Sequence, residues 1–158
     1  KLRAEGAFVS GYFYNPNIHP YTEFLKRLQT LENYSKISLL PLVVDKSYNL
    51  ETFLKGILEY GKDRCLFCYR TRLEKVFQKG SDEGFDAVTT TLLYSKYQRH
   101  DDIKAIGEEL SNKYNIDFLY EDFRKGWKVG VEESKTINMY RQQYCGCILS
   151  ERERFEKT

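Results

Sequence analysis

Two closely spaced pairs of cysteines are the residues of this sequence best suited to redox or metal chemistry. Cys65 and Cys68 lie three positions apart, and Cys145 and Cys147 flank Gly146. Residues three apart share one face of a helix, so two such thiolates can bind one soft metal centre. A glycine lets the chain turn tightly enough for two sulfurs to meet, and a disulfide in so small a ring is strained and easily reduced.

The spacing alone leaves four interpretations of these cysteines open. Both pairs together could form a four-cysteine zinc site, or Cys65 and Cys68 could form a thioredoxin-like redox motif. Cys65 and Cys68 could instead hold an iron–sulfur cluster with two ligands from outside this sequence, leaving Cys145 and Cys147 as a separate redox pair. The fourth interpretation is that all four are buried structural cysteines.

Strands that alternate with helices must position these cysteines. Apolar and β-branched runs predict strands over residues 7–14, 37–44, 85–91 and 117–123. Helically spaced apolar residues predict helices over residues 21–34, 50–58, 65–77, 101–114 and 132–140. This alternation predicts an α/β fold with a mostly parallel, Rossmann-like sheet and helices on both faces. The apolar run over 37–44 is typical of a strand buried on both faces, whereas Pro41 within it indicates an edge position or a bulge. Thr22, Asn49 and Asp101 or Asp102 are expected to cap helices.

The length of 158 residues predicts one α/β domain over residues 1–150, followed by a charged tail over 151–158. The segment 1–6 has the composition of a last helical turn, with Gly6 just past its end. No N-cap or first turn precedes that segment in the sequence. We therefore expect a first strand and most of a helix ahead of Lys1.

Composition excludes several classes of protein. A sequence that is 41% hydrophobic and 15% aromatic is not disordered, and three prolines among 158 residues exclude a collagen-like chain. The net charge of +2 neither requires nor excludes a nucleic-acid partner. No apolar run approaches the roughly 18–20 residues of a membrane span, so no membrane partner is expected. Without a secretory signal, the paired cysteines indicate a cytoplasmic protein.

Polar, cationic and aromatic residues follow each predicted strand, at the sheet edge where parallel α/β folds bind ligands. His19 and Asp45 follow the first two strands, and either could donate a proton. The residues of this kind after the last two strands are Tyr94, Ser95, Lys96, Arg99, Arg124, Lys125 and Trp127. Tyrosines interleaved with lysine and arginine suit bases stacked on aromatic rings, although most tyrosines of a small domain are half-buried core.

Five segments, in this order, resemble one family of enzymes. They are Gly11–Pro20 (GYFYNPNIHP), Arg64–Leu73 (RCLFCYRTRL), Thr89–Tyr97 (TTTLLYSKY), Asp122–Arg124 and Tyr140–Ser150 (YRQQYCGCILS). Together they resemble the cobalamin-independent epoxyqueuosine reductases of the QueH type, across residues 11–150. The resemblance implies an oxidoreductase that reduces the epoxide of epoxyqueuosine, at the anticodon wobble position of tRNA, to queuosine in the last step of its synthesis. It also implies a layout similar to nucleotide-hydrolase-like α/β domains.

The same resemblance assigns roles to the cysteines. Cys65 and Cys68 are implied ligands of a 4Fe–4S cluster, with two further ligands from a Cys-Cys segment expected ahead of Lys1. Cys145 and Cys147 are the implied redox-active pair, and an additional iron beside the cluster is compatible with the family. An electron donor is required, and the sequence identifies neither that donor nor the oligomeric state.

The remaining candidate residues complete this interpretation. Asp45, His19 or a tyrosine would protonate the epoxide oxygen. Lys96, Arg99, Arg124 and Lys125 would contact tRNA phosphates, with Tyr94, Ser95 and Trp127 beside the bases. The alternatives are a zinc-stabilised RNA-binding domain without catalytic activity and a general dithiol oxidoreductase.

Overall fold

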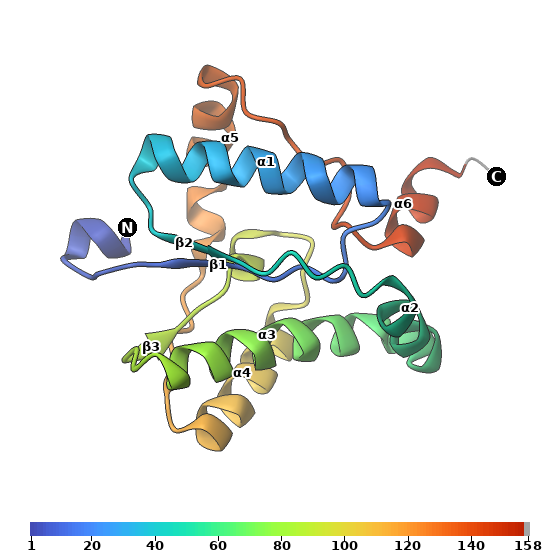
Figure 1. The fold of residues 1–158 in the computed structure, drawn as a ribbon, viewed down its shortest axis with the longest axis horizontal. Coiled ribbons are helices and arrows are strands. Elements are labelled where there is room, and N and C mark those ends of the chain that lie inside the picture. The colour runs from blue at the N-terminus through green and yellow to red at the C-terminus, as the bar shows by residue number, and fades with distance from the viewer. Residues whose placement is uncertain (157–158) are drawn as a thin grey trace. The chain divides into compact units, whose positions relative to one another are not determined.

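The computed structural model describes residues 1–156, and the chain divides into two compact units. Unit 1 comprises Lys1–Leu50 and Met139–Thr158, and unit 2 comprises Glu51–Asn138. Within the described residues, each unit contains one sheet of two parallel strands together with helices (Figure 1). The α/β class and the parallel pairing are therefore confirmed, whereas one Rossmann-like sheet with helices on both faces stays a prediction.

Unit 1 is built around a β–α–β connection. Strand β1 (Gly11–Phe13) pairs in parallel with β2 (Leu42–Val44), with Gly11 opposite Leu42. Helix α1 (Tyr21–Ser38) joins them and runs alongside both strands in Figure 1. The buried core of this unit is Phe13, Ile18, Phe24 and Leu28. It forms because helical spacing sets Phe24 and Leu28 on one face of α1.

The predicted strand over residues 37–44 is wrong in its first half. Helix α1 continues to Ser38, and Leu39 then takes a left-handed conformation with φ 51°. Ile37 and Leu39 are 70% and 79% exposed, and Val43 within β2 is 40% exposed. The expectation of burial on both faces therefore fails, because β2 is three residues long and alternates its side chains.

Segment 1–6 matches its prediction. A 3-10 helix covers Leu2–Glu5, and Gly6 ends it in the left-handed conformation with φ 88°. At the other end of unit 1, helix α6 spans Ile148–Phe155. The charged segment predicted as a tail is therefore helical from 151 to 155, and residues 157–158 of that prediction lie outside the described part of the chain.

Unit 2 carries the larger core. Its elements are α2 (Leu50–Glu59, starting at the last residue of unit 1's first segment), a 3-10 turn (Gly61–Asp63), α3 (Arg64–Asp82), β3 (Ala87–Val88), a 3-10 turn (Thr91–Tyr94), α4 (His100–Tyr114), β4 (Asp117–Phe118), a 3-10 turn (Phe123–Gly126) and α5 (Trp127–Thr136). Strands β3 and β4 pair in parallel on either side of the α4 connection.

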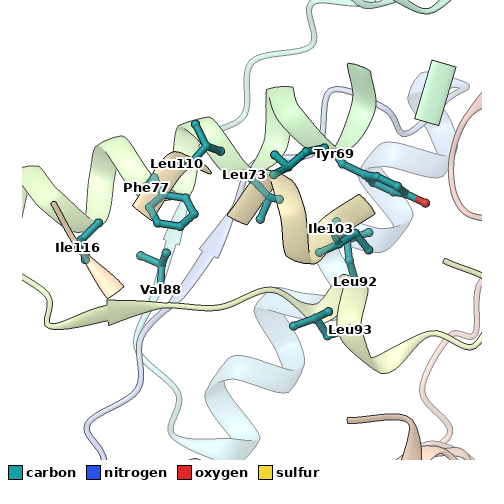
Figure 2. Close-up of a cluster of buried hydrophobic side chains, with 10 residues drawn as sticks. Tyr69, Leu73, Phe77, Val88, Leu92, Leu93, Ile103, Leu110 and Ile116 are labelled. Atoms are coloured by element: carbon teal, nitrogen blue, oxygen red, sulfur yellow. The ribbon is translucent and has the colours of Figure 1, made fainter. Parts of the chain in front are cut away.

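Apolar side chains at helical spacing pack α3 against α4 and β3. Leu73 and Phe77 of α3 are almost wholly buried, as is Ile103 of α4. Figure 2 shows Phe77 above Val88 of β3, and the hydroxyl of Tyr69 pointing away from the apolar cluster. The predicted core face of the helix over 65–77 is therefore confirmed at Tyr69, Leu73 and Phe77, whereas Leu66 is only partly buried.

Several predicted helix starts and ends need correction. Helix α1 begins at Tyr21 with Pro20 as its N-cap, so Thr22 does not cap it, because the Pro20 carbonyl accepts from Glu23 and Phe24. Helix α4 begins one residue before the two aspartates, with Arg99 at its N-cap position. The last predicted helix, over 132–140, is instead α5, which starts at Trp127 directly after a 3-10 turn. Asn138, with φ 50°, excludes its continuation to residue 140.

Among the residues that the structure describes, no helix combines the length and the apolar character that crossing a bilayer requires.

Candidate functional site

The Cys145–Gly146–Cys147 turn lies in unit 1, directly before α6. Cys145 is exposed, whereas Cys147 is only 7% exposed, and the two are not joined by a disulfide. Gly146 has φ 120°, and a Cβ there would lie 2.9 Å from the Asn17 amide nitrogen and 3.0 Å from Ile18 Cγ1. No other residue type fits this position without strain, because both the backbone angle and the space exclude a side chain.

Three successive carbonyl groups of this turn accept hydrogen bonds from one segment of unit 1. Asn17 Nδ2 and Arg27 Nη1 donate to the Cys145 carbonyl at 3.3 and 3.2 Å. Arg27 Nη2 donates to the Tyr144 carbonyl at 3.0 Å, and the His19 amide donates to the Gly146 carbonyl at 2.8 Å. Residues 17–27 thus hold the cysteine turn, although more than a hundred positions separate the two segments in the chain.

His19 is buried beneath this turn, with 1% of its surface exposed. Its Nδ1 lies 3.0 Å from the hydroxyl oxygen of Tyr48, and its carbonyl accepts a hydrogen bond from the Tyr144 hydroxyl. Burial lowers the pKa of His19, because the charged imidazolium loses solvation. Burial therefore favours the neutral imidazole, whose Nδ1 shares a hydrogen bond with the half-buried Tyr48 hydroxyl.

Asp45 follows β2, as predicted, and is half-buried. Its Oδ1 accepts hydrogen bonds from the Ser47 amide at 2.9 Å and from the Ser47 hydroxyl at 2.5 Å. The Tyr14 hydroxyl has a raised pKa, chiefly because of burial and secondly because of the nearby Asp45 charge. Asp45 is thus positioned by its own turn and sits near two tyrosines, since Tyr12 Oη lies 3.5 Å from its Oδ2.

Cys65 and Cys68 lie in the first turns of α3, in unit 2, and both are partly buried. The next residue, Tyr69, is 3% exposed, and its pKa is raised to about 12, mainly by burial and further by the charges of the two cysteines. Its hydroxyl donates to Gln98 Oε1 at 2.9 Å and accepts from the Arg99 amide at 3.2 Å. Tyr69 thus ties the first turns of α3 to residues 98 and 99, beside two thiols that share one helical face.

The described residues contain no group of three or more His, Cys, Asp and Glu side chains that could hold a metal ion. A 4Fe–4S cluster takes four thiolate ligands. Cys65 and Cys68 therefore fit half of such a ligand set, because they lie one helical turn apart on α3.

An aromatic cluster in unit 2, with the lysine beside it, contains three of the predicted RNA-contacting residues, Tyr94, Lys96 and Trp127. The Tyr94 and Trp127 rings lie 5.3 Å apart between centroids, and Tyr97 meets the Trp127 ring edge-on at 6.3 Å. The Lys96 ammonium lies 5.2 Å from the Tyr97 ring and 6.0 Å from the Trp127 ring. The cluster combines stacking surfaces with a cation, as nucleic-acid sites do. Ser95 lies beside it, and its hydroxyl accepts from the Tyr97 amide at 3.3 Å.

The four predicted phosphate-contacting cations differ in how far they are already neutralised. Arg124 forms a two-pronged ion pair with Asp122 at 2.7 Å, which holds the pKa of that carboxyl far below its usual range. Arg99 pairs with Asp63 at 3.3 Å and also with Asp102. Lys96 and Lys125 are exposed and form no ion pair with the described residues. The two lysines are thus the cations best able to bind phosphate.

The comparisons with known proteins decide the family. The family model described as "Epoxyqueuosine reductase QueH" matches residues 1–153. The Epoxyqueuosine reductase QueH of Dehalococcoides mccartyi is 34% identical over 153 residues, which cover 97% of this chain and 84% of that protein. The protein of the same name from Thermotoga maritima is 35% identical, covering 92% of this chain and 81% of that protein. In the Helicobacter pylori protein of that name, 33% identical, the match covers 42% of its length.

This chain belongs to the epoxyqueuosine reductase QueH family. The QueH family match covers both cysteine pairs, the His19 segment and the aromatic cluster, so every predicted site residue lies inside it.

Sequence reasoning missed several residues of this QueH-family site. They are Arg27 beside the cysteine turn, Tyr48 beside His19, and Tyr97 in the aromatic cluster, whereas Asn17 was expected only as a polar residue after the first strand. Arg27 lies on the core face of α1, because it is three positions after Phe24 and four before Leu31. That spacing was the available signal for its burial, although it did not identify the carbonyls that Arg27 contacts. Asn17 and Tyr97 belong to two of the five segments that carried the family resemblance.

Proposed function

We propose that this chain reduces epoxyqueuosine in tRNA to queuosine, with Cys145 and Cys147 as the redox-active pair. The observation that supports this proposal most is the QueH family match over residues 1–153, which includes both cysteine pairs. The exposure of Cys145 next to a buried Cys147 supports it further, because a dithiol that exchanges with a partner needs one accessible sulfur.

The reduction of the epoxide consumes the same numbers of electrons and protons that a dithiol releases. Both carbon–oxygen bonds of the epoxide break, a carbon–carbon double bond forms, and the oxygen leaves as water. This requires two electrons and two protons, which is what two thiols release when they become a disulfide. An external electron donor must then reduce the disulfide before the next turnover.

The proposal includes a 4Fe–4S cluster held in part by Cys65 and Cys68. When bound, such a cluster supplies single-electron transfer and a Lewis-acidic iron. Cys65 and Cys68 provide two thiolates at i and i+3 of α3, and the family resemblance assigns the other two to a Cys-Cys segment ahead of Lys1. Tyr69, buried and hydrogen-bonded to Gln98, keeps the start of α3 fixed while the thiolates bind.

The proton for the leaving oxygen comes from unit 1 in this proposal. Asp45 is half-buried, and His19 contacts the half-buried Tyr48 at 3.0 Å. Since His19 itself is 1% exposed, its proton would pass through the Tyr48 hydroxyl. Tyr48 is therefore the group of this pair that would touch the substrate.

The tRNA surface of this proposal is the aromatic cluster of unit 2 with its flanking cations. Lys96 and Lys125 would bind phosphates, and Trp127 with Tyr94 would stack on bases. Arg99 and Arg124 would contribute less, because carboxylates already neutralise them.

The test is an anaerobic assay of the full-length protein with tRNA that carries epoxyqueuosine, followed by mass spectrometry of the digested nucleosides. We expect conversion to queuosine, abolished in Cys145→Ser and Cys147→Ser although both variants still bind tRNA. We expect about four irons per chain and a brown colour, both lost in Cys65→Ser and Cys68→Ser but kept in Cys147→Ser. About one zinc per chain, no visible band and no conversion would instead establish a zinc-stabilised RNA-binding domain.

A further inference from the structure

Arg27 is a buried cation in unit 1 whose donors are nearly all used. It is 9% exposed. Its Nε pairs with Glu23 at 2.7 Å, and its Nη1 donates to Gln142 Oε1 at 2.9 Å as well as to the Cys145 carbonyl. Its Nη2 donates to the Tyr144 carbonyl. A buried charge is costly unless it is paired and hydrogen-bonded, so these partners are what makes the burial of Arg27 tolerable.

The partners of Arg27 are themselves fixed. The Glu23 carboxylate accepts two contacts from the Tyr140 hydroxyl, at 2.9 and 2.8 Å, and the guanidinium carbon lies 5.1 Å from the Tyr144 ring centroid. The planar guanidinium donates in several fixed directions at once, which the single ammonium of a lysine does not. The site therefore requires the shape of arginine and not its charge alone.

The consequence of this network falls on the cysteine turn. Arg27 binds the Tyr144 and Cys145 carbonyls, and the His19 amide binds the Gly146 carbonyl, so rotation of any of these three peptide groups would break a hydrogen bond. The same arrangement leaves the Cys145 residue at the surface and buries Cys147 to 7% exposure. The two cysteines therefore differ in access although only a glycine separates them.

We propose that Arg27 is a positioning residue that fixes the order in which the two cysteines react. This proposal rests on the redox role of the two cysteines in the proposed function. A dithiol reductant attacks Cys145 Sγ of the oxidised pair, the sulfur–sulfur bond breaks, and Cys147 leaves as a thiolate. The second thiol of the reductant then attacks the mixed disulfide and releases Cys145. The reductant is oxidised to its disulfide, and the pair gains two electrons and two protons.

The first test measures alkylation of each cysteine in the reduced full-length protein, by iodoacetamide pulses and mass spectrometry. In the wild-type protein, Cys145 should react at least about tenfold faster than Cys147 because of its exposure. In Arg27→Gln, the Cys147 rate should rise at least about tenfold while the Cys145 rate stays within about twofold, because the turn opens more often. Arg27→Lys should behave like Arg27→Gln.

The control variant is Arg152→Gln, which removes an exposed ion pair of α6 in the same unit and should leave both rates unchanged. If Arg27→Gln does not fold, Gln142→Ala is the substitute, because Gln142 is exposed and accepts one hydrogen bond from Arg27. This variant should raise the alkylation rate of Cys147 about threefold. Unchanged Cys147 rates in the folded variants overturn the proposal, because a merely structural arginine would alter stability without altering this access.

The second test separates this proposal from the proposed function. Glutathione disulfide should form a mixed disulfide with Cys145 in Cys147→Ser at least about tenfold faster than with Cys147 in Cys145→Ser. Equal rates overturn the reaction order. If the wild-type pair forms no intramolecular disulfide on oxidation, the redox role in the proposed function fails, even where the alkylation result for Arg27 stands.

Discussion

The Nδ1 atom of His19 lies 3.0 Å from the hydroxyl oxygen of Tyr48, and the two rings meet edge to face with centroids 5.6 Å apart. This contact connects a buried titratable group to a residue nearer the surface. If the pair donates the proton to the leaving oxygen, Tyr48→Phe should lower the turnover number about 10²–10⁴-fold while tRNA affinity stays unchanged. The measurement is single-turnover conversion by the full-length protein. Tyr34→Phe, on the exposed part of α1, is the matched control, and full turnover in Tyr48→Phe would assign the proton to Asp45 instead.

Gly146→Ala should destabilise unit 1 and disturb the cysteine turn. The substitution adds a Cβ 2.9 Å from Asn17 Nδ2 at a position with φ 120°, so we expect a loss of about 1–3 kcal/mol in the free energy of unfolding. Urea denaturation measures this loss. Gly6→Ala is the control, because Gly6 also has a positive φ but nothing lies within 4 Å of its Cβ. An equal loss in both variants would attribute the effect to backbone strain alone.

Trp127→Ala should weaken tRNA binding by about 1–3 kcal/mol without changing its salt dependence, because stacking involves no counterion release. Lys96→Ala and Lys125→Ala should each lower the slope of log affinity against log salt by about 0.7–0.9. Arg124→Ala should lower it less, because Asp122 already pairs with that guanidinium. Fluorescence anisotropy over a salt series measures the tRNA affinity and its salt dependence for all four variants. Identical slopes in the wild-type and lysine variants would place the tRNA surface elsewhere.

Tyr69→Phe should change the response of stability to alkaline pH. The folded protein holds the pKa of Tyr69 at about 12, above the value of about 10 of an unfolded tyrosine, chiefly through burial. Its raised pKa therefore contributes stability that is fully present below pH 10 and is lost as pH rises toward 12. The stability of the wild-type protein relative to Tyr69→Phe should fall across this window by up to about 1.4 kcal/mol per pH unit. Urea denaturation from pH 7 to 11.5 tests this, and a constant difference contradicts it.

Local patterns in the sequence predicted what depends on neighbours along the chain. The alternation of strands and helices, the buried face of α3 at Tyr69, Leu73 and Phe77, and the glycine end of the first turn are all confirmed. They follow from side-chain periodicity and from backbone angles that only glycine adopts readily. The family resemblance likewise rests on short segments, and the family match over residues 1–153 confirms it.

The boundaries and the environment of the site depend on contacts that no local pattern contains. The run over 37–44 is apolar enough for a buried strand, yet α1 takes its first residues and leaves Ile37 exposed. Helical spacing puts Arg27 on the face of α1 that carries Phe24 and Leu28, but only folding sets it against carbonyls 117 and 118 positions later in the chain. Residue types and spacing were enough to identify the paired cysteines as the candidates for redox or metal chemistry. The difference in exposure between Cys145 and Cys147 follows only from the folded chain, because burial results from packing between distant segments and not from residue type.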